Sequence, residues 1–205
     1  RRVLFRSLIL GLGISGRAAV ELAAARGIKV AAIDENVSSD LENFKSSFSK
    51  NAAVSVELGW KGDKLPKADL AVVSPGIAAS SHLLNSVIAS GTPVISELDF
   101  GFRHCSTPVL AVTGTNGKTT TTELTCHLLN AIGRRAAVSG NIGIPLSKTV
   151  LDGNKYDFIV VEASSFQLDN STSFSPVSAV ILNITSDHMN RYGNELDYVK
   201  SKFSV

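Results

Sequence analysis

The stretch Thr113-Gly-Thr-Asn-Gly-Lys-Thr-Thr120 combines a glycine turn with a lysine and threonines, which is chemistry suited to phosphate. The strict pattern G-x-x-x-x-G-K-[ST] requires a glycine where this sequence has Val112. An apolar run nevertheless precedes the turn and a helix-period segment follows it, so the context favours a phosphate-binding loop over a plain turn capped by threonines. Lys118 would then reach the β- and γ-phosphates of a nucleotide, and the Thr119 hydroxyl would bind Mg²⁺.

Polar side chains follow other apolar runs of the same half of the sequence. Glu162 comes at the end of Phe158 to Val161, and Asn183, Asp187 and His188 come after the run that ends at Leu182. The carboxyl ends of parallel strands meet at one edge of a sheet, where ligands bind. We therefore expect Glu162 to bind Mg²⁺ beside the loop, His188 to contact a second metal or the substrate, and Asn141 in "SGNIGIP" to contact the substrate.

A second glycine motif lies near the start of the sequence. Gly11-x-Gly13-x-x-Gly16 follows an apolar run and opens a helical segment, and Asp34 ends the next apolar run. This is the context of the dinucleotide-binding fold, in which a diphosphate contacts the helix N-terminus and the acid contacts a ribose or base. The motif does not distinguish NAD, FAD or a UDP-sugar, and packing of helix on strand alone would also explain the glycines.

Short apolar runs alternate with helix-period segments along the whole chain, which predicts an α/β fold with parallel sheets. We expect a Rossmann-like domain over residues 1–96 and a second α/β domain, built on the phosphate-binding loop (P-loop), over residues 97–205. The stretch from Ser96 to Pro108 is expected to connect them. The expected strands are 8–10, 30–33, 70–73, 93–95, 109–112, 136–139, 158–161 and 179–182, and the expected helices are 15–26, 40–48, 80–90, 119–132 and a final one from Glu195.

Composition narrows the function classes. The chain has 205 residues, is 44% hydrophobic and 19% charged, and carries a formal net charge of +2 with scattered basic residues. It is therefore expected to bury a core, and it lacks the basic stripe of a nucleic-acid-binding protein. The apolar run near the N-terminus is broken by glycines and followed by Arg17, so neither a signal peptide nor a membrane span is expected. Two distant cysteines, Cys105 and Cys126, fit a cytoplasmic protein.

The stretches "GLGISG", "TGTNGKTT", "GNIG", "EASSFQL" and "ILNITSDHMNRYG" resemble the Mur ligase family, and within it the D-glutamate-adding members. The resemblance covers nearly the whole chain after residue seven. It implies an ADP-forming ligase of peptidoglycan precursor synthesis, in which ATP activates the carboxylate of UDP-N-acetylmuramoyl-L-alanine and D-glutamate attacks the acyl phosphate. ATP and Mg²⁺ are the implied cofactors, and a cytoplasmic monomer is expected. The chain ends within a helical pattern and is expected to be an inactive N-terminal fragment.

The resemblance also implies roles for individual residues. Lys118, His188 and Lys202 are implied as catalytic, and Lys202 carries a carbamate in the family. Thr119 and Glu162 would bind one Mg²⁺, and His188 and Lys202 a second. The implied ATP-binding residues are Gly114, Thr115, Asn116, Gly117, Lys118, Thr119 and Thr120. The implied substrate-binding residues are Ile14, Ser15, Gly16, Asp34, Glu35, Gly76, Asn141 and His188, of which Ile14, Ser15 and Gly16 would hold the UDP diphosphate.

Two other classes of function remain open from the residues alone. Gly11, Gly13, Gly16 and Asp34 would also suit an NAD-dependent oxidoreductase, although that class leaves the loop at Gly114 to Thr119 unexplained. A non-catalytic nucleotide-binding module would suit the fragment by itself. Binding of NADH in place of a UDP-sugar would favour the oxidoreductase.

Overall fold

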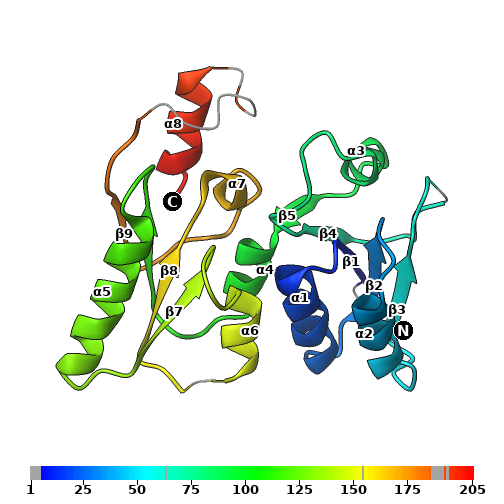
Figure 1. The fold of residues 1–205 in the computed structure, drawn as a ribbon, viewed down its shortest axis with the longest axis horizontal. Coiled ribbons are helices and arrows are strands. Elements are labelled where there is room, and N and C mark those ends of the chain that lie inside the picture. Colours follow the sequence, from blue (N-terminus) through cyan, green and yellow to red (C-terminus); the bar gives the residue numbers. More distant parts are fainter. Residues whose placement is uncertain (1–5, 63, 154, 186–191, 193) are drawn as a thin grey trace. The chain divides into compact units, whose positions relative to one another are not determined.

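The computed structural model describes residues 6–62, 64–153, 155–185, 192 and 194–205 (Figure 1). The chain divides into two compact units, one ending at Glu97 and the other beginning at Leu98. Each unit contains one parallel sheet with its own helices, and we describe each by itself. The expected α/β architecture with a Rossmann-like first domain is confirmed.

The first unit is built on a five-stranded parallel sheet in the order β3-β2-β1-β4-β5. Its strands are β1 (Arg6–Leu10), β2 (Lys29–Asp34), β3 (Val54–Leu58), β4 (Leu70–Val73) and β5 (Val94–Ser96), and its helices are α1 (Ile14–Ala25), α2 (Ser39–Ser47) and α3 (His82–Ala89). Buried Leu8 and Leu10 of β1 pack in one cluster with Leu83 and Val87 of α3. Because β1 lies centrally, with β2 on one side and β4 on the other, the loop after β1 opens where the strand order reverses.

The second unit has a four-stranded parallel sheet in the order β7-β8-β6-β9. Its strands are β6 (Val109–Thr113), β7 (Ala136–Gly140), β8 (Phe158–Glu162) and β9 (Ser178–Ile181). Its helices are α4 (Glu97–Arg103, which begins at the last residue of the first unit), α5 (Lys118–Ala131), α6 (Leu146–Leu151), α7 (Ser165–Leu168) and α8 (Glu195–Phe203). Val112 on β6, Val160 on β8 and Cys126 on α5 form one buried cluster, which fixes α5 against the sheet.

The sequence analysis did not predict four of the elements, namely strand β3 and helices α4, α6 and α7. Strand β3 pairs with β2 at the edge of its sheet and is only partly buried, so its apolar pattern is weak. Helix α4 occupies part of the stretch that we expected to be a connection, because Leu98 and Phe100 are buried there. Its Gly101 allows close packing, since a Cβ at that position would lie 2.8 Å from the backbone nitrogen of Ser147. Helices α6 and α7 have six and four residues, too short for a clear helical period.

Within the described residues, no helix combines the length and the apolar composition that crossing a membrane would require.

Candidate phosphate and metal site

The loop between β6 and α5 has the backbone of a phosphate-binding turn. Val112 lies inside β6, where it pairs with Glu162 of β8, so the turn itself begins at Gly114. Gly114 and Gly117 have φ angles of 145° and 83°, in the region that favours glycine. Gly117 is also the residue before the first turn of α5. The position at which the strict pattern requires its first glycine, Val112, therefore lies in the strand. The two loop positions with a positive φ, Gly114 and Gly117, are both glycines.

Asn183, just after β9, holds this turn from the neighbouring strand. The Thr115 backbone N–H donates to the carbonyl oxygen of Asn183 at 2.9 Å. The Asn116 N–H donates to Oδ1 of Asn183, and Nδ2 of Asn183 donates to the Asn116 carbonyl, both at 2.9 Å. The backbone N–H of Thr185 donates to Oγ1 of Thr115 at 3.0 Å. These bonds fix the path of the loop and leave the first turn of α5, including Thr120, at the surface.

Lys118 is the first residue of α5, and its ammonium group folds back over the loop. Nζ of Lys118 donates to the carbonyl oxygen of Thr115 at 2.8 Å. A lysine ammonium group on a flexible stem can exchange a carbonyl oxygen for a phosphate oxygen. The structure thus brings together the loop and the lysine that the sequence predicts at a phosphate.

Glu162 ends β8 and lies beside the start of α5. It is 2% exposed. Its Oε2 accepts a hydrogen bond from the Thr119 hydroxyl at 2.8 Å, and its Oε1 accepts one from Nδ2 of Asn141 at 3.0 Å. The backbone N–H of Asn141 also donates to the Glu162 carbonyl at 2.8 Å. The sequence predictions for Glu162, Thr119 and Asn141 therefore fall on one cluster of oxygen-bearing groups.

Gly140 makes the close approach of the Asn141 turn possible. A Cβ at Gly140 would lie 2.3 Å from the Glu162 carbonyl oxygen, and the φ angle is 106°. Only glycine can therefore end β7 with Asn141 facing the carboxylate of Glu162.

Lys202, on the last helix α8, contacts the loop between β6 and α5, although it lies far from that loop in the sequence. It is 2% exposed, and its Nζ donates to the Gly114 carbonyl at 2.8 Å. Its ammonium group lies 4.6 Å from the ring centroid of Tyr198, and the Tyr198 hydroxyl hydrogen-bonds Oγ1 of Thr115 at 3.1 Å. A buried lysine this close to the glycine loop fits a role with anionic substrates. His188 and Asp187 lie outside the described residues.

Sequence reasoning missed Tyr198 as part of this site. Tyr198 is 1% exposed and contacts both Lys202 and the loop. Its position four residues before Lys202 places the two side chains on one face of α8, and that spacing was the available signal.

The first unit presents its glycine motif at the carboxyl end of β1. A Cβ at Gly16 would lie 1.8 Å from the Gly11 carbonyl oxygen, so α1 can begin this close to the loop only with glycine there. The Ser74 hydroxyl, at the end of β4, donates to the same Gly11 carbonyl at 2.8 Å. Ile14 and Ser15 form the exposed or half-exposed start of α1. Their backbone N–H groups are available at a helix N-terminus, which suits a diphosphate.

Asp34 lies beside this loop and supports it. Its Oδ2 accepts from the Leu12 backbone N–H at 2.6 Å, and its Oδ1 accepts from the Asn36 backbone N–H at 2.8 Å. Asp34 is buried, with 7% of the residue exposed. The contact with a ribose or base that the sequence predicts would therefore use the remaining lone pairs of its carboxylate. Glu35 is exposed and accepts from the Ser81 hydroxyl at 3.4 Å, while Gly76 lies exposed after β4.

The described residues contain no group of three or more His, Cys, Asp or Glu side chains that could hold a metal ion. Magnesium does not need such a group, because it is commonly bound through one or two carboxylates together with waters and substrate phosphates. The hydroxyl and carboxylate oxygens of Thr119 and Glu162 form a hard donor set of this kind. The cluster therefore fits Mg²⁺ better than a transition metal.

Two family models match the chain, and together they cover most of it. Residues 5–96 match the model described as "Mur ligase MurD-like, N-terminal domain", and residues 112–205 match "Mur ligase middle domain". Among curated proteins, the UDP-N-acetylmuramoylalanine–D-glutamate ligase of Salinibacter ruber is 38% identical over 98% of this chain and 44% of its own length. The protein of the same name from Desulfosudis oleivorans is 41% identical over 95% of this chain and 42% of its own length. The chain spans less than half the length of these relatives.

Solved structures of two ligases share the fold of this chain. The UDP-N-acetylmuramate:L-alanyl-γ-D-glutamyl-meso-diaminopimelate ligase of Neisseria meningitides aligns with a TM-score of 0.58 at 18% identity, covering 98% of this chain and 67% of that one. The UDP-N-acetylmuramate–alanine ligase of Thermotoga maritima aligns with a TM-score of 0.54 at 22% identity, covering 96% and 45%. Because both family models describe Mur ligase domains and together cover most of the sequence, the chain belongs to the Mur ligase family.

Proposed function

We propose that this chain supplies the first two domains of an ATP-dependent ligase that joins D-glutamate to UDP-N-acetylmuramoyl-L-alanine in peptidoglycan precursor synthesis. The observation that carries the proposal is the Thr119–Glu162 hydrogen bond at 2.8 Å, directly beside the phosphate loop. A buried carboxylate and a hydroxyl beside such a loop are the kind of oxygen ligands that bind a nucleotide-bound Mg²⁺, which supports the proposal. The shared name of the curated relatives supports the choice of amino acid and of UDP-linked substrate.

In the proposed reaction, the loop from Gly114 to Thr120 holds the phosphates of ATP through its backbone N–H groups. Lys118 leaves the Thr115 carbonyl and neutralises the β- and γ-oxygens. Thr119 and Glu162 would hold Mg²⁺, which on binding supplies positive charge to the transferring phosphoryl group. Asn141 keeps the carboxylate of Glu162 oriented, and its exposed position also allows a contact with the substrate.

The γ-phosphoryl group passes to the carboxylate of the muramoyl-alanine substrate, which gives an acyl phosphate and ADP. The amine of D-glutamate then attacks the acyl carbon, phosphate leaves, and the amine loses a proton to complete the amide. Both reactants of the first step are anions, so positive charge at the loop lowers their repulsion. Lys202 would contribute here, with His188, through the second metal and the carbamate that the resemblance implies.

The first unit would bind the UDP part of the substrate. Its diphosphate would lie at Ile14, Ser15 and Gly16, where the helix N-terminus faces the loop. Asp34, Glu35 and Gly76 would border the uridine. We further propose that residues 1–96 form this substrate domain and residues 97–205 the ATP domain, and that the protein is a cytoplasmic monomer, in keeping with its two free cysteines.

The proposal is tested with the full-length protein from which the sequence comes. We expect phosphate release only when ATP, Mg²⁺, UDP-N-acetylmuramoyl-L-alanine and D-glutamate are all present. Lys118→Ala is expected to abolish release, whereas Lys50→Ala, at an exposed lysine of the first unit, is expected to leave it unchanged. Release that ignores D-glutamate but follows another amino acid would assign a different substrate. Tight binding of NADH by the first unit would contradict its assignment to a UDP-sugar.

A further inference from the structure

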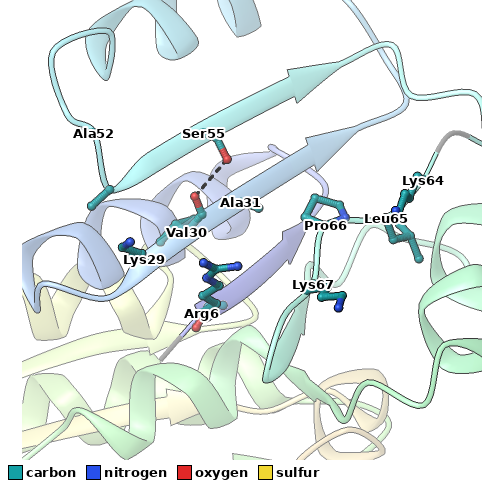
Figure 2. Close-up of a pocket in the computed structure, with 12 residues that line it drawn as sticks. Arg6, Lys29, Val30, Ala31, Ala52, Ser55, Lys64, Leu65, Pro66 and Lys67 are labelled. Atoms are coloured by element: carbon teal, nitrogen blue, oxygen red, sulfur yellow. Dashed lines mark hydrogen bonds between the residues drawn. The ribbon is translucent and has the colours of Figure 1, made fainter. Parts of the chain in front are cut away.

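The first unit contains a cavity at the edge of its sheet opposite the glycine motif. The cavity has a volume of about 560 Å³ and lies at the amino-terminal ends of β1, β2 and β3 (Figure 2). Arg6 and Lys29, the first residues of β1 and β2, line it from the sheet, and the segment from Lys64 to Lys67 lines it from the other side. The glycine motif follows Leu10, the last residue of β1, so the length of that strand, roughly 15 Å, separates the two places.

The cavity concentrates positive charge. Arg6 and Lys29 are direct partners in the parallel register of β1 and β2, so their side chains project from the same face of the sheet. Like charges at such positions repel each other and destabilise the pairing. Lys64 and Lys67 add two more cations on the facing segment, as the sticks in Figure 2 show.

These cations lack anionic partners within the part of the chain that the structure describes. No ion pair involves Arg6, Lys29, Lys64 or Lys67 in those residues. Asp69, which does contact Arg6, accepts a hydrogen bond from the Arg6 backbone N–H at 2.8 Å. An anion bound among the four side chains would offset the repulsion between them. An isolated lysine in solvent has no such repulsion and needs no bound anion.

Apart from Ser7 and Ser55, the remaining residues that line the cavity are apolar. Ala31, Leu65 and Pro66 lie between the basic groups, and Leu65 and Ala31 also pack against the core of the unit. The volume lies within the range of sites for small organic ligands. Arginine and lysine together favour phosphate, which accepts the planar fork of the former and the point charge of the latter.

We propose that this cavity binds a small phosphorylated molecule, with its phosphate among Arg6, Lys29 and Lys67 and a small apolar portion against Ala31, Leu65 and Pro66. The site is separate from the phosphate loop and from the glycine motif, so it would serve to recognise a second ligand. Binding is expected to weaken as salt is added, because the contacts are largely between exposed charges.

The test is a titration of the ¹⁵N-labelled chain with inorganic diphosphate, followed residue by residue through amide chemical shifts. Saturable shifts are expected at Ala31 and Leu65, separately from any at Gly11 to Gly16 or at Gly114 to Lys118. The double variant Lys29→Gln/Lys67→Gln is expected to bind at least tenfold more weakly at the cavity and unchanged at the two glycine loops. The matched control Lys45→Gln/Lys50→Gln removes the same charge from exposed positions outside the cavity and is expected to leave binding there intact.

Three results would overturn the proposal. In the unaltered chain, saturable shifts confined to the two glycine loops would show that the cavity does not take phosphate. An equal loss of binding in the Lys45→Gln/Lys50→Gln control would show a general effect of net charge. Citrate bound as tightly as diphosphate would show that the site does not select phosphate. The first and third results need no variant, so the proposal stays testable even if the Lys29→Gln/Lys67→Gln chain fails to fold.

Discussion

Glu162 is the residue whose surroundings bear most directly on metal binding. Its two carboxylate oxygens accept separate hydrogen bonds from Thr119 and Asn141 in a buried setting. Glu162→Gln keeps the shape but removes the charge, so we expect Mg²⁺-dependent phosphate release by the full-length protein to fall roughly 100-fold or more, with a raised requirement for Mg²⁺. The measurement is phosphate release across a Mg²⁺ titration. Glu123→Gln, at an exposed position of α5, is the matched control. Unchanged activity in Glu162→Gln would argue against metal binding at this carboxylate.

Asp157 gives a prediction about pH that is independent of the site. Arg135 donates to its two oxygens from the guanidinium at 2.7 Å and from the backbone N–H at 2.9 Å, which lowers the pKa of Asp157 from the ordinary 3.8 to about 2. A carboxyl with a lowered pKa stabilises the fold above its unfolded pKa, and this contribution is lost as pH falls from about 4 to about 2. Arg135→Gln removes the first donor, so we expect the pKa of Asp157 to rise toward 3.8 in a carboxyl NMR titration. A pKa that stays near 2 would show that the backbone donor alone is responsible.

The junction of β1 with α1 makes a prediction at the scale of elements. A Cβ at Gly16 would lie 1.8 Å from the Gly11 carbonyl oxygen and 2.7 Å from the Ser74 hydroxyl, so Gly16→Ala must push α1 away from the sheet. We expect it to lower the free energy of unfolding by about 3 kcal/mol or more, as overpacking of a close contact does. Gly13→Ala meets nothing within 4 Å and should cost less than about 1 kcal/mol.

Unfolding in urea can be followed by the fluorescence of Trp60, the single tryptophan, which is buried in the first unit. Equal transition midpoints for Gly16→Ala and Gly13→Ala would show that α1 can shift away from the sheet without cost, and would contradict the prediction.

The sequence was most informative in the buried strands and in the two glycine loops. The parallel strands and the two glycine loops followed from apolar runs and loop context, because buried strands and tight turns restrict residue choice strongly. The elements that were missed, β3, α4, α6 and α7, are short or lie at an edge, where pattern is weak and tertiary contacts decide.

The partners of the site residues were less predictable than their positions. For Asp34 the sequence predicts a contact with a ribose or base, and it does not predict the hydrogen bonds that its oxygens accept from Leu12 and Asn36 of its own unit. The meeting of Lys202 with the Gly114 carbonyl joins residues 88 positions apart, and sequence periodicity carries no information on such a contact. Long-range hydrogen bonds depend on how strands are ordered, and the order becomes visible only in the folded unit.

At the scale of the whole chain, both units contain a strand, a glycine turn and a helix in succession, with different polar groups beside the turn. Each places a glycine turn between a strand and a helix, after β1 in one and after β6 in the other. In the first unit the nearby acid, Asp34, accepts from the backbone N–H groups of Leu12 and Asn36 and from Nδ2 of Asn36, all within its own loop, which suits a rigid cradle for a substrate. In the second, the partners of Glu162 are side chains of Thr119 and Asn141, which can rotate toward a ligand. The contrast agrees with the proposal above, in which the first unit holds the UDP-linked substrate and the second binds the nucleotide.

This division predicts that nucleotide binding and ligation can be separated. The 205-residue chain contains the phosphate loop but spans less than half the length of its curated relatives, so we expect it to bind ATP with Mg²⁺ and to form no amide. Binding should raise the midpoint of thermal unfolding, since a ligand that binds only the folded state stabilises it, and Lys118→Ala should remove that increase. Differential scanning fluorimetry and an assay for the amide product measure the two properties on the same sample. Amide formation by the 205-residue chain would show that the residues that bind D-glutamate lie within these two units, and an absence of any nucleotide effect would argue against the phosphate loop itself.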